Sequence, residues 1–167
     1  FDGVKKKFGN SFSLSVNSGK LHEKEVLAVL GPNATGKTTF AKMLAGEIKP
    51  DGGDLSESVS ISYKPQYIKT EFEGTVRELL SSVKSITDSY KVEILRPLGL
   101  EKLLEKYVSD LSGGELQRVA IAMCLSRDAD MYLMDEPSAF LDVEQRLALS
   151  KLVNKIVEVK EKSALIV

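Results

Sequence analysis

A short loop in the first quarter of the chain has the residue types needed to hold a phosphate group. Residues 31–38 read Gly-Pro-Asn-Ala-Thr-Gly-Lys-Thr and fit the spacing G-x-x-x-x-G-K-[ST]. Glycines let backbone N–H groups turn toward phosphate oxygens, and the N-terminus of a following helix adds a positive dipole. We expect Lys37 to meet the β- and γ-phosphates, Thr38 to bind Mg²⁺ and Thr39 to reach the α-phosphate. The predicted nucleotide-binding residues of this loop are Gly31, Asn33, Ala34, Thr35, Gly36, Lys37, Thr38 and Thr39. A glycine-rich turn without a ligand is the alternative, and the apolar strand before the loop and the helix after it disfavour that alternative.

Two acidic residues follow a short apolar run later in the chain. Residues 131–134 read Met-Tyr-Leu-Met, and Asp135 and Glu136 come directly after them. Ligands of parallel sheets bind at the carboxyl ends of the strands. We therefore expect Asp135 to hold Mg²⁺ and Glu136 to polarise an attacking water as a general base. Two adjacent acids alone more often mark a solvated strand end, but the phosphate-binding loop favours the catalytic interpretation.

A second anion-binding pattern lies between these two. Residues 111–118 read Leu-Ser-Gly-Gly-Glu-Leu-Gln-Arg, which places Ser112 and two glycines at the N-terminus of an expected helix. One nucleotide does not need two such sites on one small domain. A composite site shared between two domains is the simplest explanation.

The elements that must position these residues alternate between strands and helices. Strands are expected from the apolar patterns and helices from apolar residues at helical spacing. This alternation predicts an α/β fold with a parallel sheet and right-handed crossovers. The strand at 26–30 is continuously apolar and is expected to be buried on both faces. The expected strands cover 12–16, 26–30, 59–63, 131–134 and 164–167, the helices 37–45, 113–126 and 143–160, the turns 17–20 and 50–54, and residues 75–107 are mostly helical.

Composition excludes several classes of function. The chain has 167 residues, which predicts one domain. Its net charge is −1, so it lacks the excess of positive charge that would hold nucleic acid by electrostatic attraction alone. A single cysteine, Cys124, excludes a disulfide framework, a Cys-rich zinc site and an iron–sulfur cluster in these residues, and it is expected in the core. His22 is expected at the surface. No apolar run reaches the ~18 residues of a membrane span, and the chain begins at Phe1, which suggests a piece of a longer protein.

Together these motifs resemble the nucleotide-binding domain of ATP-binding cassette (ABC) proteins. Residues 31–38 resemble the Walker A motif, 111–115 the signature and 131–135 Walker B, while 138–142 occupy the D-loop position. Glu136 matches the catalytic glutamate. The resemblance also implies that Ser112 and Gly114 of the signature contact the γ-phosphate of ATP held by a partner cassette. Gln66 in Tyr-Lys-Pro-Gln matches the Q-loop glutamine, a catalytic residue that touches both Mg²⁺ and the attacking water. The resemblance covers nearly the whole chain and implies ATP and Mg²⁺ as ligands.

Longer stretches resemble one subfamily, the E subfamily or RNase L inhibitor family, whose members split ribosomes into subunits. These stretches are residues 63–66, 111–120 and 135–146, and the segment 6–9 resembles the second of the family's two cassettes. The resemblance implies a P-loop NTPase core with a mainly parallel sheet, a small antiparallel β portion and an ABC-type helical insertion. We expect one cassette over 1–167 with a helical subdomain at about 71–127. By this alignment Phe1 stacks on adenine, although an edge apolar residue is an equal alternative.

The chain departs from the family pattern at two points. Ala34 stands where the family usually has glycine, which costs roughly 1 kcal/mol if that position needs a positive φ. The family's switch histidine is expected just after the strand that ends at Val167, where the sequence stops. The family's iron–sulfur domain and first cassette are expected elsewhere.

The resemblance implies a cytoplasmic ATPase of ribosome recycling whose partners are a second cassette, the ribosome and translation factors, without a membrane. This chain alone is expected to be weakly active or inactive. A transporter ATPase subunit is the main alternative, and a nucleotide-dependent scaffold with negligible turnover is another.

Overall fold

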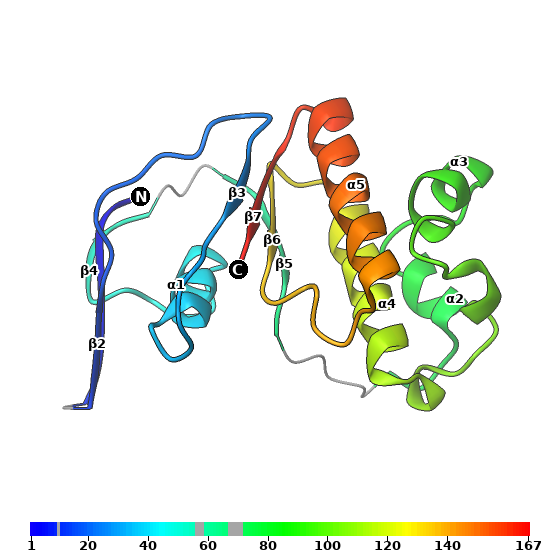
Figure 1. Cartoon of the computed structure of the whole chain (residues 1–167), viewed down its shortest axis with the longest axis horizontal. Coiled ribbons are helices and arrows are strands. Elements are labelled where there is room, and N and C mark those ends of the chain that lie inside the picture. The colour runs from blue at the N-terminus through cyan, green and yellow to red at the C-terminus, as the bar shows by residue number, and fades with distance from the viewer. Residues whose placement is uncertain (10, 56–58, 67–71) are drawn as a thin grey trace.

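The computed structural model covers residues 1–167 and describes all of them except 10, 56–58 and 67–71. Its centre is a parallel sheet in the order β3-β7-β6-β5, with α1 on one side and α4 and α5 on the other (Figure 1). A small antiparallel sheet of order β2-β1-β4 lies beyond α1. This arrangement confirms the expected α/β fold with a mainly parallel sheet and a small antiparallel portion.

The strands of the parallel sheet follow the apolar runs of the sequence. They are β3 (Val26–Ala28), β5 (Ile61–Lys64), β6 (Met131–Met134) and β7 (Ser163–Ile166). All residues of β6 are buried, because side chains alternate between two core clusters, one on each face. Tyr132 and Met134 pack toward α4 and α5, and Met131 and Leu133 pack toward α1.

The expected double burial of the strand at 26–30 is wrong. β3 forms the edge of the sheet and pairs only with β7 among the described strands. Val26 is 39% and Leu30 89% exposed. A continuous apolar run is ambiguous in this respect, since its residue types do not say whether a strand lies at the centre or the edge of a sheet.

The antiparallel sheet contains elements that the sequence patterns missed. It consists of β1 (Asp2–Phe8), β2 (Phe12–Ser15) and β4 (Gly52–Asp54). β2 was expected, but β1 was not, and residues 50–54 were expected to be a turn only. β1 carries three consecutive lysines and β4 two glycines, so neither has the apolar alternation that predicts a strand.

The longer helices match their expected bounds closely. They are α1 (Lys37–Leu44), α4 (Gly113–Ser126) and α5 (Val143–Lys160). Both α4 and α5 begin with a capping box, which satisfies N–H groups at the helix start and fixes its first residue.

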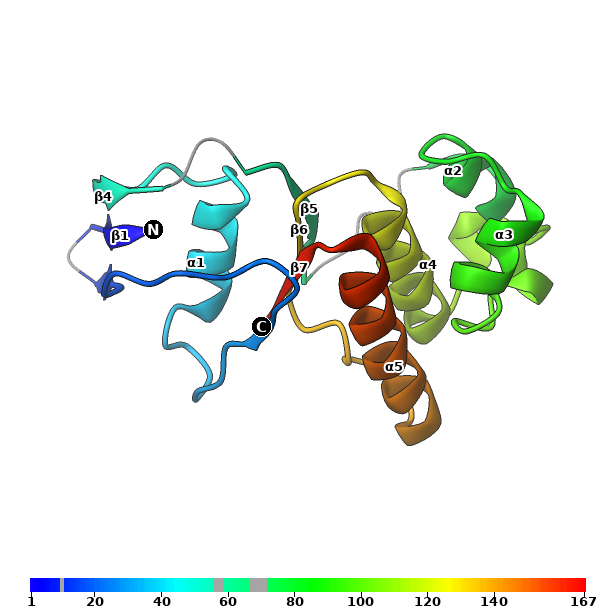
Figure 2. The same cartoon turned by 90° about the horizontal axis from the view of Figure 1, so that it is seen from above.

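The segment between β5 and α4 forms short helical pieces that pack on the far side of α4 (Figure 2). These pieces are α2 (Val76–Ser81), α3 (Asp88–Tyr90), a π-helical turn at Lys91–Leu95 and 3₁₀ turns at Glu101–Leu103 and Val108–Asp110.

No helix of the described residues combines the length and the apolar character required to cross a bilayer.

Candidate nucleotide-binding and hydrolysis site

The phosphate-binding loop joins the end of β3 to the start of α1, as its sequence context predicted. Three of its residues have positive φ: Gly31 (155°), Ala34 (62°) and Gly36 (96°). At Gly36 the positive φ requires glycine, while an added Cβ would lie 2.9 Å from a methyl carbon of Leu14 on β2, which that side chain would have to move to accommodate. Ala34 does have the positive φ for which its family pattern uses glycine, and this left-handed conformation destabilises a residue that has a Cβ.

The start of α1 keeps its backbone donors available for an anion. Its N-cap, Gly36, provides no side-chain hydrogen bond, and the first N–H groups of a helix have no partner within the helix. The ammonium group of Lys37 lies over the same loop, where it donates to the carbonyl oxygens of Gly31 at 2.9 Å and Pro32 at 2.7 Å. Free N–H groups, a helix dipole and a lysine therefore meet at one place, which suits a phosphate chain.

Asp135 stands at the carboxyl end of β6 and is completely buried. Neither of its carboxylate oxygens has a hydrogen-bond partner among the described residues. Burial raises the pKa of this carboxyl group, and neighbouring Glu136 raises it further. The Thr38 hydroxyl and the ammonium groups of Lys64 and Lys42 act in the opposite direction. A buried carboxylate without a partner is costly, so this position is suited to receive a cation.

The residues around Asp135 fit a magnesium ion of the kind that phosphates help to bind. Mg²⁺ prefers oxygen ligands and usually takes one or two from protein, with water and phosphate oxygens completing its shell. Asp135 supplies the carboxylate and Thr38 a nearby hydroxyl. Within the part of the chain that the structure describes, no group of three or more His, Cys, Asp or Glu residues forms a complete metal site by itself.

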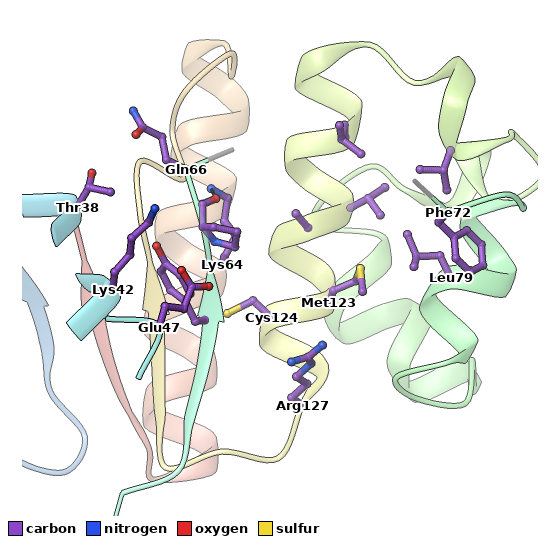
Figure 3. A pocket seen from close by; sticks show the side chains of 16 residues that line it. Thr38, Lys42, Glu47, Lys64, Gln66, Phe72, Leu79, Met123, Cys124 and Arg127 are labelled. Atoms are coloured by element: carbon purple, nitrogen blue, oxygen red, sulfur yellow. Dashed lines mark hydrogen bonds between the residues drawn. The ribbon is translucent and has the colours of Figure 1, made fainter. Parts of the chain in front are cut away.

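Gln66 and Thr38 line the same cavity of about 580 Å³, between α1 and α4 (Figure 3). Gln66 follows β5, the sheet neighbour of β6, so the expected Q-loop glutamine leaves the sheet beside Asp135 and Glu136. The tertiary structure thus brings Thr38, Gln66 and the acid pair to one edge of the sheet, as expected for parallel strands.

The backbone of Glu136 has a positive φ of 45°. Its N–H donates to the Val167 carbonyl at 2.8 Å, and its carbonyl accepts from Gln117 Nε2 at 2.7 Å and from the Ala139 N–H at 3.2 Å. The main chain therefore turns sharply after β6. Since a bulky residue rarely adopts this conformation, its surroundings must hold it in place.

Two residues of the site were missed in the sequence. Lys64 is 1% exposed and donates to the carbonyls of Asp135 at 2.8 Å and Pro65 at 2.9 Å, and burial lowers its pKa to about 8. Gln117 is 2% exposed, and its side-chain amide donates a hydrogen bond to the Glu136 carbonyl. A lysine at the end of a strand and a glutamine inside an apolar helix were the available signals, but their partners lie far away in sequence.

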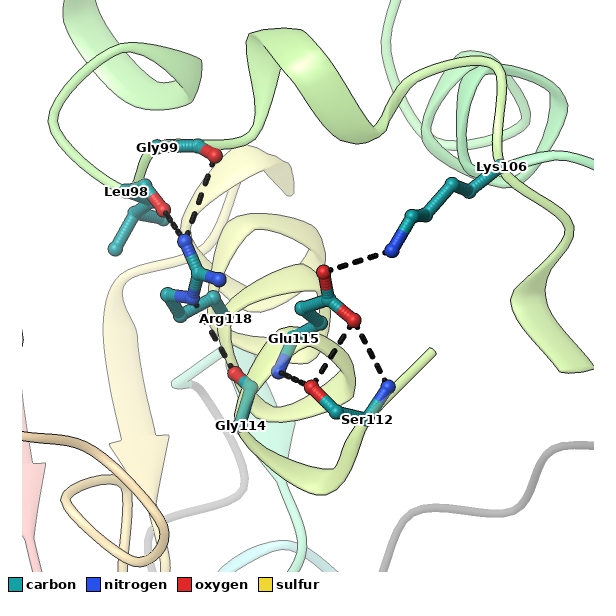
Figure 4. Close-up of polar contacts among 7 residues, drawn as sticks. All are labelled: Leu98, Gly99, Lys106, Ser112, Gly114, Glu115 and Arg118. Carbon is teal, nitrogen blue, oxygen red and sulfur yellow. Dashed lines mark hydrogen bonds and ion pairs between the residues drawn. The ribbon is translucent and has the colours of Figure 1, made fainter. Parts of the chain in front are cut away.

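The signature residues form the N-terminus of α4 (Figure 4). Ser112 Oγ accepts from the Glu115 N–H at 3.3 Å, and a carboxylate oxygen of Glu115 accepts from the Ser112 N–H at 2.9 Å and from its hydroxyl at 3.0 Å. Lys106 donates to the other oxygen of Glu115 at 3.0 Å. The Ser112 N–H and Lys106 lower the pKa of Glu115 to about 2.

Gly114 packs against the loop at 138–142, because an added Cβ would lie 2.8 Å from the Phe140 carbonyl oxygen. α4 carries Gly114 and Ser112 on the side of the sheet opposite to α1 (Figure 1). Among the described residues, no hydrogen bond joins Ser112 or Gly114 to the phosphate-binding loop. The two anion-binding patterns remain separate in this chain.

The remaining single-residue expectations have different outcomes. Cys124 is buried and His22 exposed, as predicted. The ring of Phe1 packs edge-on against Phe40 of α1, with a centroid distance of 5.1 Å, and lies beside Gly19. Its predicted contact with adenine stays a prediction, as do the phosphate contacts of Thr39 and Asn33.

Comparison with known proteins places this geometry in a family. The family model described as "ABC transporter" matches residues 14–139. An uncharacterized ABC transporter ATP-binding protein of Methanocaldococcus jannaschii is 56% identical over 170 residues, covering 100% of this chain and 28% of that protein.

Two solved structures have nearly the same fold. RNase-L Inhibitor superposes with a TM-score of 0.95 at 51% identity, covering 99% of this chain and 33% of that one. The archaeal ribosome recycling factor solved in complex with the archaeal ribosomal stalk protein gives the same TM-score and identity, covering 99% and 32%. This chain therefore spans about a third or less of the length of these relatives. By its motifs, fold and matched residues, the chain belongs to the ABC family of ATPases and is similar throughout to RNase L inhibitor.

Proposed function

We propose that this chain is an ATP-hydrolysing cassette of a ribosome-recycling factor and supplies half of each of two composite ATP sites. The observation that carries the proposal is the buried, unpartnered carboxylate of Asp135 beside the Thr38 hydroxyl at the start of α1. That arrangement suits a magnesium nucleotide better than it suits a closed core.

The phosphates of ATP would be held by the loop at 31–38. Its free N–H groups and the Lys37 ammonium group offset the negative charge, and the hydrogen bonds from Lys37 to Gly31 and Pro32 keep that cation at the loop. Thr38, Asp135 and Gln66 would hold Mg²⁺. When bound, this ion neutralises charge on the phosphate oxygens.

Hydrolysis would depend on Glu136 as the group that orients and deprotonates water. Its position directly after Asp135 and its fixed backbone favour this role. Ser112 and Gly114 would contact the γ-phosphate bound by a partner cassette, because α4 carries them away from this chain's own loop. Closure of two cassettes would then perform mechanical work, and hydrolysis would reset the pair.

The ribosomal role rests on similarity. The recycling factor solved with the stalk protein is 51% identical to this chain over the aligned third of its length, and a related structure, described as a model of ribosome-bound archaeal Pelota and ABCE1, is 54% identical over 28% of its length. The same similarity supports a cytoplasmic location, a second cassette in the full-length protein and translation factors as further partners.

Binding and turnover of the isolated chain test the site. A fluorescent ATP analogue with Mg²⁺ should bind the chain, K37A should abolish this binding, and K102A should not, since it removes an equal charge from an exposed position among the helical pieces beside α4. Hydrolysis should be slow in a dilute monomer and fast in the full-length protein. Fast turnover by the dilute chain would contradict the composite site.

The full-length protein tests the biological role. Added to whole ribosomes with ATP, it should produce free subunits on a sucrose gradient, and E136Q should keep ATP binding while slowing hydrolysis. Loss of ATP binding in E136Q would refute the role of Glu136. Unsplit ribosomes together with co-purification of a membrane protein would favour a transporter subunit.

A further inference from the structure

Gln117 has a buried side-chain amide that is hydrogen-bonded to the backbone of the proposed catalytic glutamate. It lies in the second turn of α4 and is 2% exposed, with apolar neighbours such as Val119 and Ile121 on the same helix. Its Nε2 donates to the Glu136 carbonyl at 2.7 Å. A buried amide in an apolar core is retained only with satisfied hydrogen bonds, so this contact fixes the geometry on both sides.

The backbone at Glu136 needs such support. Its φ of 45° is unfavourable for a residue with a side chain by roughly 1–2 kcal/mol. The hydrogen bond from Glu136 N–H to Val167 fixes one side of this peptide, and the bond from Gln117 fixes the carbonyl on the other side. The direction in which the Glu136 side chain leaves the main chain depends on this conformation.

The helix that carries Gln117 also carries the signature residues. Gln117 is five residues after Ser112, or about 7.5 Å along the helix. Gly114 packs against the Phe140 carbonyl, and the loop containing Phe140 returns to Glu136 through the Ala139 N–H. The N-terminal half of α4 is therefore connected to the backbone of Glu136 by two routes, the Gln117 hydrogen bond and the loop that carries Phe140 and Ala139.

We propose that Gln117 is a positioning residue that sets the orientation of Glu136 for water activation, so that hydrolysis in this cassette follows the position of its own signature helix. This inference rests on the proposed ATPase function. Gln117 acts only through the Glu136 carbonyl and has no assigned contact with nucleotide.

The test replaces Gln117 with methionine, which has similar volume and no N–H donor, in the full-length protein. We expect the kcat for MgATP to fall about 10- to 100-fold, because a misplacement of about 1 Å at a catalytic group has effects of this size. The KM and the affinity for the fluorescent ATP analogue should change less than threefold. If Q117M does not fold, Q117N provides the same test, since it keeps the amide but withdraws it by one methylene group.

A matched control lies on the same helix. Ser126 is also buried and hydrogen-bonded, to Ala122 and Tyr90, at the end of α4 distant from the signature. S126A should lower the thermal stability and leave kcat unchanged. An equal loss of kcat in S126A, or an unchanged kcat in Q117M, would overturn the proposal.

The double variant separates positioning from a general structural effect. If Gln117 acts through Glu136, adding Q117M to E136Q should leave the slow residual hydrolysis of E136Q within twofold. A further fall by the same factor as in the wild-type background would overturn the inference. Failure of the proposed function would look different, because the unmodified protein would then not hydrolyse ATP and E136Q would have no effect.

Discussion

The Lys64 ammonium group lies across the ends of two parallel strands and donates a 2.8 Å hydrogen bond to the Asp135 carbonyl. A second bond, to Pro65 at 2.9 Å, ties the same group to the segment that leads into Gln66. One buried lysine therefore joins the Q-loop to the acid pair, and its positive charge offsets part of the negative charge on Asp135.

The burial of Lys64 predicts a pH dependence of stability. The pKa of Lys64 is about 8 in the folded state, against 10.5 for an unperturbed lysine, so the unfolded chain binds more protons between these two pH values. The free energy of unfolding of the wild type should therefore rise, relative to that of K64M, as the pH increases from about 8 to about 10.5. The largest slope expected is about 1.4 kcal/mol per pH unit.

Urea unfolding of both proteins at several pH values measures this difference. K20M is the matched control, because Lys20 is exposed. Parallel curves for wild type and K64M across this pH range would show that the ammonium group of Lys64 is not desolvated by folding.

Asp135 should stabilise the chain when Mg-ATP is bound and destabilise it when the site is free of ligand. Burial raises the pKa of its carboxyl group, which means that folding disfavours the charged form at neutral pH. D135N removes this charge and should raise the Tm in EDTA by a few degrees, since about 1 kcal/mol corresponds to 2–4 °C in a domain of this size. The same variant should lose the increase in Tm that Mg-ATP gives the wild type.

Differential scanning fluorimetry with and without Mg-ATP checks both effects. D128N removes a charge from an exposed aspartate and should retain the ligand-induced shift. A D135N protein that is less stable in EDTA, or that still responds to Mg-ATP, would contradict the proposed metal role.

Replacing Ala34 with glycine should relieve strain in the phosphate-binding loop. Its φ of 62° costs roughly 1–2 kcal/mol for a residue with a Cβ. Glycine has greater conformational freedom in the unfolded chain, which lowers the stability gained from the substitution by about 0.4–1 kcal/mol. A34G should therefore increase the free energy of unfolding by up to about 1.6 kcal/mol. A45G is the control with the opposite sign, because Ala45 has a right-handed φ of −69° at the end of α1. Chemical denaturation of both variants measures the two changes, and destabilisation by A34G would refute the strain argument.

The capping box of α4 predicts acid sensitivity. The pKa of Glu115 is lowered from 4.5 to about 2, first by the Ser112 N–H and next by Lys106. The stabilisation from its carboxylate is thus present above pH 4.5 and lost as the pH falls toward 2. E115Q can keep the capping box but not the charge, so it should be less stable than wild type by no more than about 1 kcal/mol at pH 6, given the solvent screening near the surface. The difference in unfolding free energy should disappear near pH 2, and a constant difference between pH 6 and pH 2 would show that the charge of Glu115 is not involved.

The sequence by itself determined the elements whose signals are local. The loop at 31–38, the acid pair after β6 and the capping box of α4 depend on residues a few positions apart, so spacing alone was sufficient to place them. The bounds of α4 and the burial of β6 followed from apolar patterns in the same way.

Only the tertiary structure decided the contacts between residues distant in sequence. Lys64 meets Asp135 across 71 positions and Gln117 meets Glu136 across 19, and no periodicity in either segment indicates its partner. The edge position of β3 depends in the same way on which strand lies beside it. The positive φ of Ala34 likewise depends on how β3 and α1 are held, because propensity alone disfavours that conformation for alanine.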